Sequence, residues 1–234
     1  MMSNAEINVF SAGAVQPGIV KVIEAFRNAS PHHVKITFAT APIILKRIGA
    51  SDGLDLVIAP PAVLDEWAKA AKTTAADRVT IGRIGVGVMV REDAPLPRIA
   101  SVDDFKQAVL SAESVVYNQA STGIYLEKLF ERLGIAEQLK PKTLRYPDAA
   151  AVLDHVAKGN GAEIGLGATT VIIEGVNKGL KFVGPLPPEI QNYTTYAAAV
   201  VNAGSASDSD AAREFVRFLT EPVAQKVFAS AGIQ

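Results

Sequence analysis

The chain has 234 residues, and its 23 lysine and arginine residues nearly balance 24 aspartate and glutamate residues, for a formal net charge of −1. With 49% hydrophobic and 20% charged residues, it has the composition of a folded protein, long enough for one large domain or two small ones. Near-neutral charge gives no electrostatic case for a nucleic-acid partner. The absence of cysteine excludes disulfides, thiolate metal sites and cysteine nucleophiles.

The beginning of the sequence bears on localisation. MMSNAEINVF lacks the basic segment, long apolar run and cleavage site of a signal peptide. We therefore expect a cytoplasmic protein, or a periplasmic one if a signal has been removed. No uninterrupted apolar stretch approaches the ~18 residues of a membrane-spanning helix, so no membrane span is expected.

Apolar, β-branched stretches alternate with amphipathic ones from the start of the chain. Strands are expected at INVFSAG, VKITFAT and LDLVIAP, and each is followed by a predicted helix: PGIVKVIEAFRN, APIILKRIG and AVLDEWAKAAK. Proline in the first turn favours the start of the first helix, and Trp67 is expected to pack inward. RVTIGRIGVGVMV, residues 78–90, predicts a long strand spaced by glycines.

The same alternation continues to the end of the chain. Ser101 is expected to cap the helix SVDDFKQAVL, and Asp148 to cap DAAAVLDHVAKG. Gly134 ends the predicted helix TGIYLEKLFERLG, and two helices broken near Pro222 close the chain. The remaining predicted elements are the strands ESVVYNQ, KTLRYP, AEIGLGA, LKFVG and NYTTYAAAVV and the helix TTVIIEGVNKG, residues 169–179.

Repeated strand–helix alternation predicts an α/β protein whose sheets are mostly parallel and flanked by helices. The strands at 78–90 and 193–201 are candidates to cross between two lobes. Lobe 1 is then discontinuous and comprises residues 1–82 and 196–234, whereas lobe 2 comprises residues 83–195. We expect the ligand cleft between them.

Four junctions share one pattern, in which a strand ends, small or polar residues follow and a helix begins. They are FSAGAVQP (10–17), FATAP (38–42), YNQASTG (117–123) and RYPDAA (145–150). In parallel sheets such junctions lie at the carboxyl ends of strands, where ligands bind. A helix N-terminus there carries roughly half a positive charge and binds anions without lysine or arginine. Ordinary helix capping explains any one junction, but four in two lobes favour a shared anion site.

Longer segments carry a family resemblance. Three segments correspond to the first three strands and two anion-binding loops of a known protein family: INVFSAGAVQPGIVKVIEAF, ITFATAPIILKRI and LDLVIAP. Two other segments are more specific to this family: the helix start STGIYLEKLFERLGI and the C-terminal signature FLTEPVAQKVFASAGI. In these segments the chain resembles the molybdate-binding proteins of ABC transporters, which have the two-lobed type II periplasmic solute-binding fold. The resemblance implies a monomer without cofactor that closes over a small anion and delivers it to an ABC permease.

The resemblance also implies ligand contacts at Ala14, Ala41, Thr122, Ala149 and roughly Ala168. Molybdate binders have serine hydroxyls at the first two positions and a tyrosine at the last, so this chain lacks charge-assisted hydrogen bonds worth roughly 1.5–3 kcal/mol each. We therefore expect an oxyanion or an organic carboxylate rather than molybdate specifically. The predicted ligand-binding residues are Ser11, Ala14, Thr40, Ala41, Arg83, Asn118, Ser121, Thr122, Ala149 and Thr169.

Several of these residues have specific expected roles. Ser121 is expected to cap its helix while Asn118 and Thr122 face the cleft. Arg83 is either a surface residue or a clamp for a carboxylate. Arg145 and Tyr146 are expected at the rim of the site.

An enzyme is the alternative, because some proteins that resemble this family isomerise aconitate. Moving its double bond requires proton transfer next to a carboxylate, for which Asp148 or Tyr146 would serve. Otherwise we expect no catalytic residue, because HExxH, P-loop and nucleophile-elbow patterns are missing from the sequence. His32, His33 and His155 are expected to be exposed or to pack, and no clustered metal ligands are expected. A ligand-sensing domain that has lost transport is a third reading.

Overall fold

The computed structural model describes residues 4–74, 76–176, 178–202 and 206–234. The chain divides into two compact units, unit 1 with residues 1–83 and 195–234 and unit 2 with residues 84–194. Both boundaries fall inside strands, namely β4 (Val79–Arg91) and β9 (Tyr193–Val200). These are the two long strands predicted to run from one lobe into the other. Residue 177, within the predicted helix 169–179, lies outside the described residues.

The sheet of unit 1 has the strand order β2-β1-β3-β9. Strands β1 (Glu6–Ala12), β2 (His33–Ala39) and β3 (Leu56–Ala59) are parallel, and β9 pairs antiparallel with β3. The four side chains of β3 are completely buried, because helices cover both faces of this sheet as they do in most parallel sheets.

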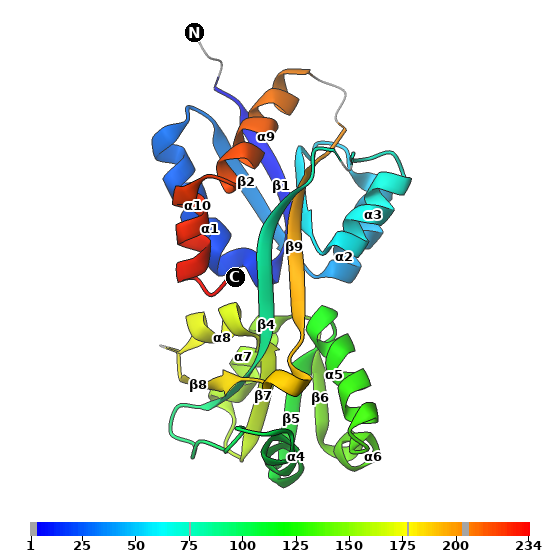
Figure 1. Ribbon diagram of the computed structural model, residues 1–234, viewed down its shortest axis with the longest axis vertical. Coiled ribbons are helices and arrows are strands. Elements are labelled where there is room, and N and C mark those ends of the chain that lie inside the picture. Colours follow the sequence, from blue (N-terminus) through cyan, green and yellow to red (C-terminus); the bar gives the residue numbers. More distant parts are fainter. Residues whose placement is uncertain (1–3, 75, 177, 203–205) are drawn as a thin grey trace. The chain divides into compact units, whose positions relative to one another are not determined.

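Helices of unit 1 lie on both sides of its sheet. Figure 1 shows α1 next to α10 on one side and α2 next to α3 on the other. Trp67 is fully buried as predicted, and its indole N–H donates to the Ile44 carbonyl over 3.2 Å. This bond ties α3 to α2. The helical segments are η1 (Gly13–Val15), α1 (Gln16–Ala29), α2 (Ala41–Lys46), η2 (Arg47–Ala50), α3 (Pro61–Lys69), α9 (Ala206–Leu219) and α10 (Pro222–Ser230).

The sheet of unit 2 has the order β4-β7-β5-β6, and β8 (Leu180–Pro185) pairs with the same strand β4. Strands β5 (Ser114–Asn118), β6 (Thr143–Tyr146) and β7 (Glu163–Ala168) are parallel, whereas β4 runs antiparallel to β7 and β8. This alternation of parallel strands and helices agrees with the architecture predicted from the sequence.

Two apolar clusters fill unit 2. Phe105, Leu126 and Phe130 belong to the larger one, and Val152, Val156 and Ile172 belong to the smaller one. Helix α5 supplies Leu126 and Phe130, and α7 supplies Val152 and Val156; these two helices lie on opposite sides of the sheet in Figure 1. The helical segments are α4 (Val102–Ser111), α5 (Ser121–Arg132), α6 (Ala136–Leu139), η3 (Lys140–Lys142), α7 (Ala149–Lys158), α8 (Thr169–Gly175) and η4 (Pro188–Ile190).

Most predicted helix ends are confirmed. The Ser101 hydroxyl accepts the Asp104 N–H over 3.1 Å, and the Asp148 carboxylate accepts the Ala151 N–H over 2.9 Å. The prediction that Ser121 caps α5 is wrong, because Ser121 is already the first helical residue and Ala120 holds the cap position without a side-chain bond. Asn118 causes this shift, since its Oδ1 accepts the Ala120 N–H over 3.0 Å and turns the chain two residues earlier.

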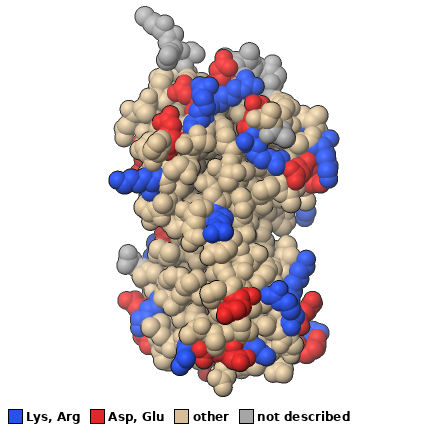
Figure 2. Space-filling view, viewed as in Figure 1, with Lys and Arg blue, Asp and Glu red and all other residues tan. Residues whose placement is uncertain are grey.

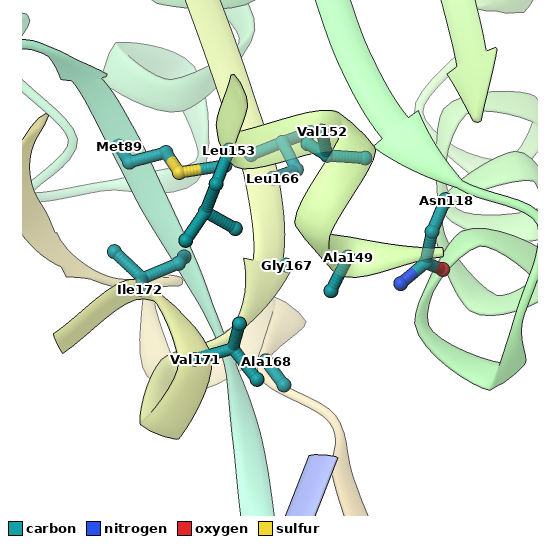
Figure 3. A pocket seen from close by; sticks show the side chains of 10 residues that line it. All are labelled: Met89, Asn118, Ala149, Val152, Leu153, Leu166, Gly167, Ala168, Val171 and Ile172. Atoms are coloured by element: carbon teal, nitrogen blue, oxygen red, sulfur yellow. The ribbon is translucent and has the colours of Figure 1, made fainter. Parts of the chain in front are cut away.

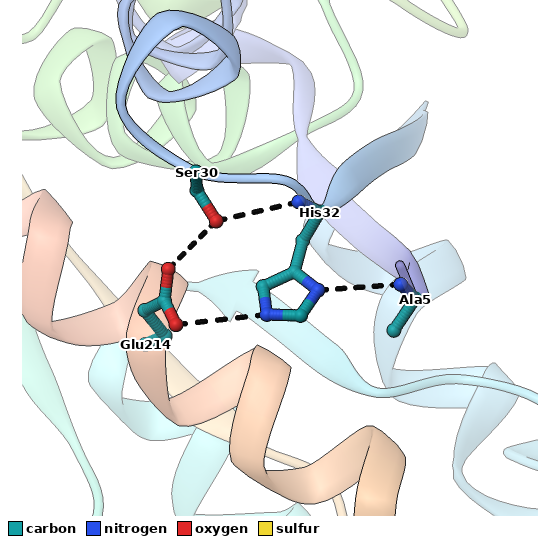
Figure 4. Close-up of polar contacts among 4 residues, drawn as sticks. All are labelled: Ala5, Ser30, His32 and Glu214. Carbon is teal, nitrogen blue, oxygen red and sulfur yellow. Dashed lines mark hydrogen bonds and ion pairs between the residues drawn. The ribbon is translucent and has the colours of Figure 1, made fainter. Parts of the chain in front are cut away.

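A polar network in unit 1 joins α9 to the chain before β2 (Figure 4). Ser30 donates to one Glu214 oxygen over 2.6 Å, and His32 Nε2 lies 3.6 Å from the other. Because the Ala5 N–H donates to His32 Nδ1 over 3.2 Å, the ring proton of the neutral histidine must be on Nε2, facing Glu214. This network lies at the amino ends of β1 and β2, at the edge of the sheet opposite to the one where η1 and α2 begin.

The charged side chains are dispersed. On the face drawn in Figure 2, blue and red groups are interspersed and no extended area has one sign. This agrees with the balanced sequence composition. Among the described helices, none has the length and apolarity required to cross a bilayer.

Candidate functional site

The parallel strands of unit 1 all end at one edge of its sheet. Ala12 of β1 is in register with Ala39 of β2, and Ser11 is in register with Ile58 of β3. A helical turn begins directly after each strand, at Gly13, Ala41 and Pro61. This edge, the carboxyl edge of unit 1, brings together four predicted residues: Ser11, Ala14, Thr40 and Ala41.

The helices at this edge start without side-chain caps. The cap positions of α1, α2 and α3 are held by Val15, Thr40 and Pro60, and none of these side chains bonds to the first turn. The first backbone N–H groups of a helix have no partner within the helix. The positive ends of these helix dipoles therefore lie at this edge, and the side chains of the cap residues do not bond to them. Ser11 was predicted to contact the ligand, but its side chain is fully buried. Its hydroxyl donates to the Ala12 carbonyl over 3.3 Å.

Tyr196 is a candidate that the sequence reasoning missed. Ala197 pairs antiparallel with Ala59, so the preceding residue of β9 lies just beyond the end of β3, at the carboxyl edge of unit 1. Tyr196 is 5% exposed, and its hydroxyl has no hydrogen bond within the described residues. Burial raises the pKa of Tyr196, so the phenol stays protonated and is a hydrogen-bond donor. Its strand was predicted, but the antiparallel pairing that places it here was not.

Arg83 lies at the end of unit 1 on β4 and is exposed. Its backbone pairs with the C-terminal residue, because the Arg83 N–H donates to the Gln234 carbonyl over 2.7 Å and the Gln234 N–H donates back over 3.0 Å. The structure therefore holds its backbone firmly. Its role as a clamp for a carboxylate stays a prediction.

Unit 2 has a corresponding carboxyl edge, where β5, β6 and β7 end and α5, α7 and α8 begin. Asn118 is in register with Tyr146, and the Gln119 N–H donates to the Tyr146 carbonyl over 2.8 Å. A methyl group on Gly123 would lie 1.7 Å from the Asn118 carbonyl oxygen, so only glycine lets the first turn of α5 approach the strand this closely. The predicted residues Asn118, Ser121, Thr122, Ala149 and Thr169 all belong to this edge.

A pocket opens at this edge within unit 2 (Figure 3). Of the predicted ligand-binding residues, Asn118 and Ala149 line the pocket. Ala168, a contact that the family resemblance implies, lines it as well. Ser121, Thr122 and Thr169 are not among its lining residues. The other lining residues are Met89, Val152, Leu153, Leu166, Gly167, Val171 and Ile172.

Asp148 changes the character of the neighbouring helix end. Its carboxylate accepts the Ala151 N–H and therefore occupies the N-terminus of α7. A negative side chain there offsets the positive end of the helix dipole. Ala149 consequently lies next to a negative charge, which weakens the case that its backbone binds an anion.

Tyr146 does not direct its hydroxyl to the pocket. The hydroxyl is 2.8 Å from His155 Nδ1, and His155 Nε2 lies 3.8 Å from Glu163. Since α7 runs back from the carboxyl edge and Glu163 begins β7, this network leads toward the opposite edge of the sheet. The prediction that Tyr146 lies at the rim as an acid or base therefore does not fit the direction of its hydroxyl.

Arg145 is also engaged inside unit 2. It forms an ion pair with Glu127, and its guanidinium lies 5.6 Å from the centre of the Tyr117 ring. Burial raises the pKa of Tyr117, and the Glu127 carboxylate adds to this, whereas Arg145 opposes it. These contacts occupy the arginine that was expected at the rim. Within the described ranges, no three metal-ligating side chains form a group.

Comparisons with known proteins agree with this geometry. Residues 7–234 match the model of the bacterial extracellular solute-binding protein family. An aconitate isomerase from a Pseudomonas species is 28% identical over 236 residues, covering 97% of this chain and 87% of that protein.

Solved structures show the same fold. The periplasmic molybdate-binding protein of Azotobacter vinelandii superposes with a TM-score of 0.80 at 15% identity, covering 97% of this chain and 98% of that one. The sulfate-binding protein of Mycobacterium tuberculosis superposes with a TM-score of 0.78 at 20% identity, covering 98% and 86%. The predicted periplasmic solute-binding fold is therefore confirmed. Since the family model spans almost the whole sequence, the chain belongs to the bacterial extracellular solute-binding protein family.

Proposed function

We propose that the protein binds a small anion, an oxyanion or an organic carboxylate, at the carboxyl edges of its sheets for uptake by an ABC permease. The observation that carries this is that α5 begins after β5, at the carboxyl edge of unit 2, without a side-chain cap, as α2 and α3 do after β2 and β3 in unit 1. At the edge of unit 2, α7 differs because Asp148 caps it, and α10, which follows another helix, also lacks a side-chain cap. An uncapped N-terminus leaves N–H donors and a positive dipole end for a bound anion.

Two further observations support an anion. The structural relatives named above include a molybdate-binding and a sulfate-binding protein. Tyr196 adds a protonated hydroxyl at the edge of unit 1. Delivery to a permease from the periplasm is part of this proposal, and the description of the family as extracellular supports it.

The test is a ligand panel read by thermal shift and calorimetry: molybdate, sulfate, acetate, 3-methylbutanoate and cis-aconitate. A ligand at 100 times its dissociation constant stabilises the native state by about 2.7 kcal/mol. For a chain of this size that raises Tm by about 5–10 °C. The neutral compound 3-methylbutanamide is the control. If no anion raises Tm, the proposal is wrong.

Isomerisation of aconitate is the second candidate, favoured by the 28% identity that extends over 97% of this chain. The reaction removes a proton next to a carboxylate and returns it at the other end of the allylic system. Asp148 is the exposed carboxylate at the carboxyl edge of unit 2, while Tyr146 is held by His155. An ultraviolet assay of cis/trans interconversion with the wild type and Asp148→Asn tests this. Interconversion by the wild type that the variant loses supports it, and an inactive wild type excludes it.

A further inference from the structure

The loop between α7 and β7, residues 159–162, contains the one asparagine of the sequence that is followed by glycine. Asn160 and Gly161 lie outside helices and strands, and Asn160 is exposed. The Asn160 side chain forms no hydrogen bond within the described part of the chain, and the Gly161 N–H donates to no described group. The side-chain amide and the backbone nitrogen that follows it are therefore both accessible for reaction.

The chain is held on either side of this asparagine–glycine pair. The Gly159 carbonyl accepts from the Arg91 guanidinium, and the Ala162 carbonyl accepts the Glu113 N–H over 2.9 Å. Between these two bonds the backbone is not part of a hydrogen-bonded element, so its dihedral angles vary more than those of a helix. Glycine extends this range because it has no Cβ. The nitrogen of the glycine can therefore approach the asparagine side chain, which a helix would prevent.

We infer that Asn160 is a site of spontaneous modification, at which it converts to aspartate and isoaspartate. The Gly161 nitrogen loses its proton to hydroxide and bonds to Cγ of Asn160. The bond from Cγ to Nδ2 then breaks, and Nδ2 takes a proton from water and leaves as ammonia. Water opens the resulting cyclic imide at either of its two carbonyls. One opening gives aspartate, and the other gives isoaspartate, in which the main chain passes through the side-chain carbon atoms.

The charge that this reaction adds lies close to two carboxylates. Glu113 and Glu163 occupy the positions where Cβ atoms on Gly161 and Gly159 would stand. A carboxylate between these two glycines is repelled by both side chains, and Arg91 at the Gly159 carbonyl offsets only part of the repulsion. Isoaspartate also lengthens the connection between α7 and β7. The modified chain should therefore unfold at a lower urea concentration than the unmodified chain, and high salt should reduce the difference.

The experiment is incubation of the full chain in mildly alkaline buffer, with and without denaturing urea, followed by peptide mass mapping and labelling with an isoaspartyl methyltransferase. We expect residue 160 to convert at least about tenfold faster than Asn4 and Asn28, which are also exposed but are followed by alanine. In the native chain the rate should be within about threefold of the rate in urea, because no hydrogen bond holds the reacting groups. Conversion no faster than at the two controls would overturn the inference. Protection of residue 160 by more than about tenfold in the native chain would overturn it as well.

Two variants attribute the reaction to this pair. Asn160→Gln requires a larger ring for the same attack, and Gly161→Ala crowds the attacking nitrogen, so each should lower the rate of labelling at least about tenfold. The matched controls are Asn28→Gln and Gly49→Ala, which should leave the rate unchanged because they alter exposed positions outside the loop. Urea denaturation verifies that each variant is folded. Labelling of Asn160→Gln as strong as that of the wild type would overturn the inference.

Discussion

Helices α5 and α7 begin at the same edge of the same sheet, yet they differ in what covers their N-termini. Ala120 leaves α5 without a side-chain cap, whereas Asp148 caps α7 with a carboxylate. Both strands that precede them end in register, at Asn118 and Tyr146. Position at a carboxyl edge therefore does not by itself make an anion site. The residue at the cap position decides whether the dipole end is open or already neutralised.

The largest expected effect comes from the close contact that holds α5 on its strand. Gly123→Ala places a methyl group 1.7 Å from the Asn118 carbonyl oxygen, so the helix start must move. We expect a loss of about 3 kcal/mol in the free energy of unfolding, measured by urea denaturation. Gly49→Ala is the control, because nothing lies within 4 Å of its new methyl group. Equal stability of the two variants would contradict the close approach of α5 to β5.

Removing the negative charge at the cap of α7 tests whether this charge distinguishes α7 from α5. Asp148→Asn retains a good cap but removes the negative charge, so stability should change by less than about 0.5 kcal/mol. The affinity for the best-binding anion of the panel should rise about threefold, because the dipole end is no longer offset. Calorimetry and urea denaturation measure the two quantities. A fall in affinity would contradict this and would indicate that the Asp148 carboxylate contributes to ligand binding.

The reciprocal change closes the open end of α5. Ala120→Asp introduces a carboxylate at the cap position, which should stabilise the protein by about 0.5–1 kcal/mol. The same carboxylate should lower anion affinity, and the loss should shrink at high salt because the repulsion is screened. Ala120→Asn supplies a cap without charge and serves as its matched control. If both variants bind anions like the wild type, α5 takes no part in binding.

Tyr196 extends the comparison to the edge of unit 1. Burial raises its pKa, so the folded state holds the phenol proton more tightly than the unfolded chain. Its contribution is fully present below the unfolded value of about 10 and is lost as pH rises toward the folded value. Tyr196→Phe should therefore flatten the decline of the urea midpoint above about pH 10. Loss of anion binding in this variant at neutral pH would identify the hydroxyl as a ligand donor.

Much of the fold follows from local sequence patterns. Alternating apolar and amphipathic stretches predicted the helices and strands, because periodicity and β-branching act within a few residues. The caps at Ser101 and Asp148 were predicted because a cap bond joins residues three apart. Gly134 has a φ of +71°, which its place after a helical pattern anticipates.

Features that depend on pairing between distant segments were decided only by the tertiary structure. The packing of β6 against α7 turned the Tyr146 hydroxyl to His155. The turn at Asn118 that displaced the cap from Ser121 is local by contrast, because its bond joins residues two apart. Tyr196 reaches the carboxyl edge only because β9 pairs antiparallel with β3, more than a hundred residues earlier in the chain. The sequence alone determined which elements form and that several helices follow strand ends. Which side chains meet at those ends depends on sheet register, because register is a property of two paired segments that neither segment encodes alone.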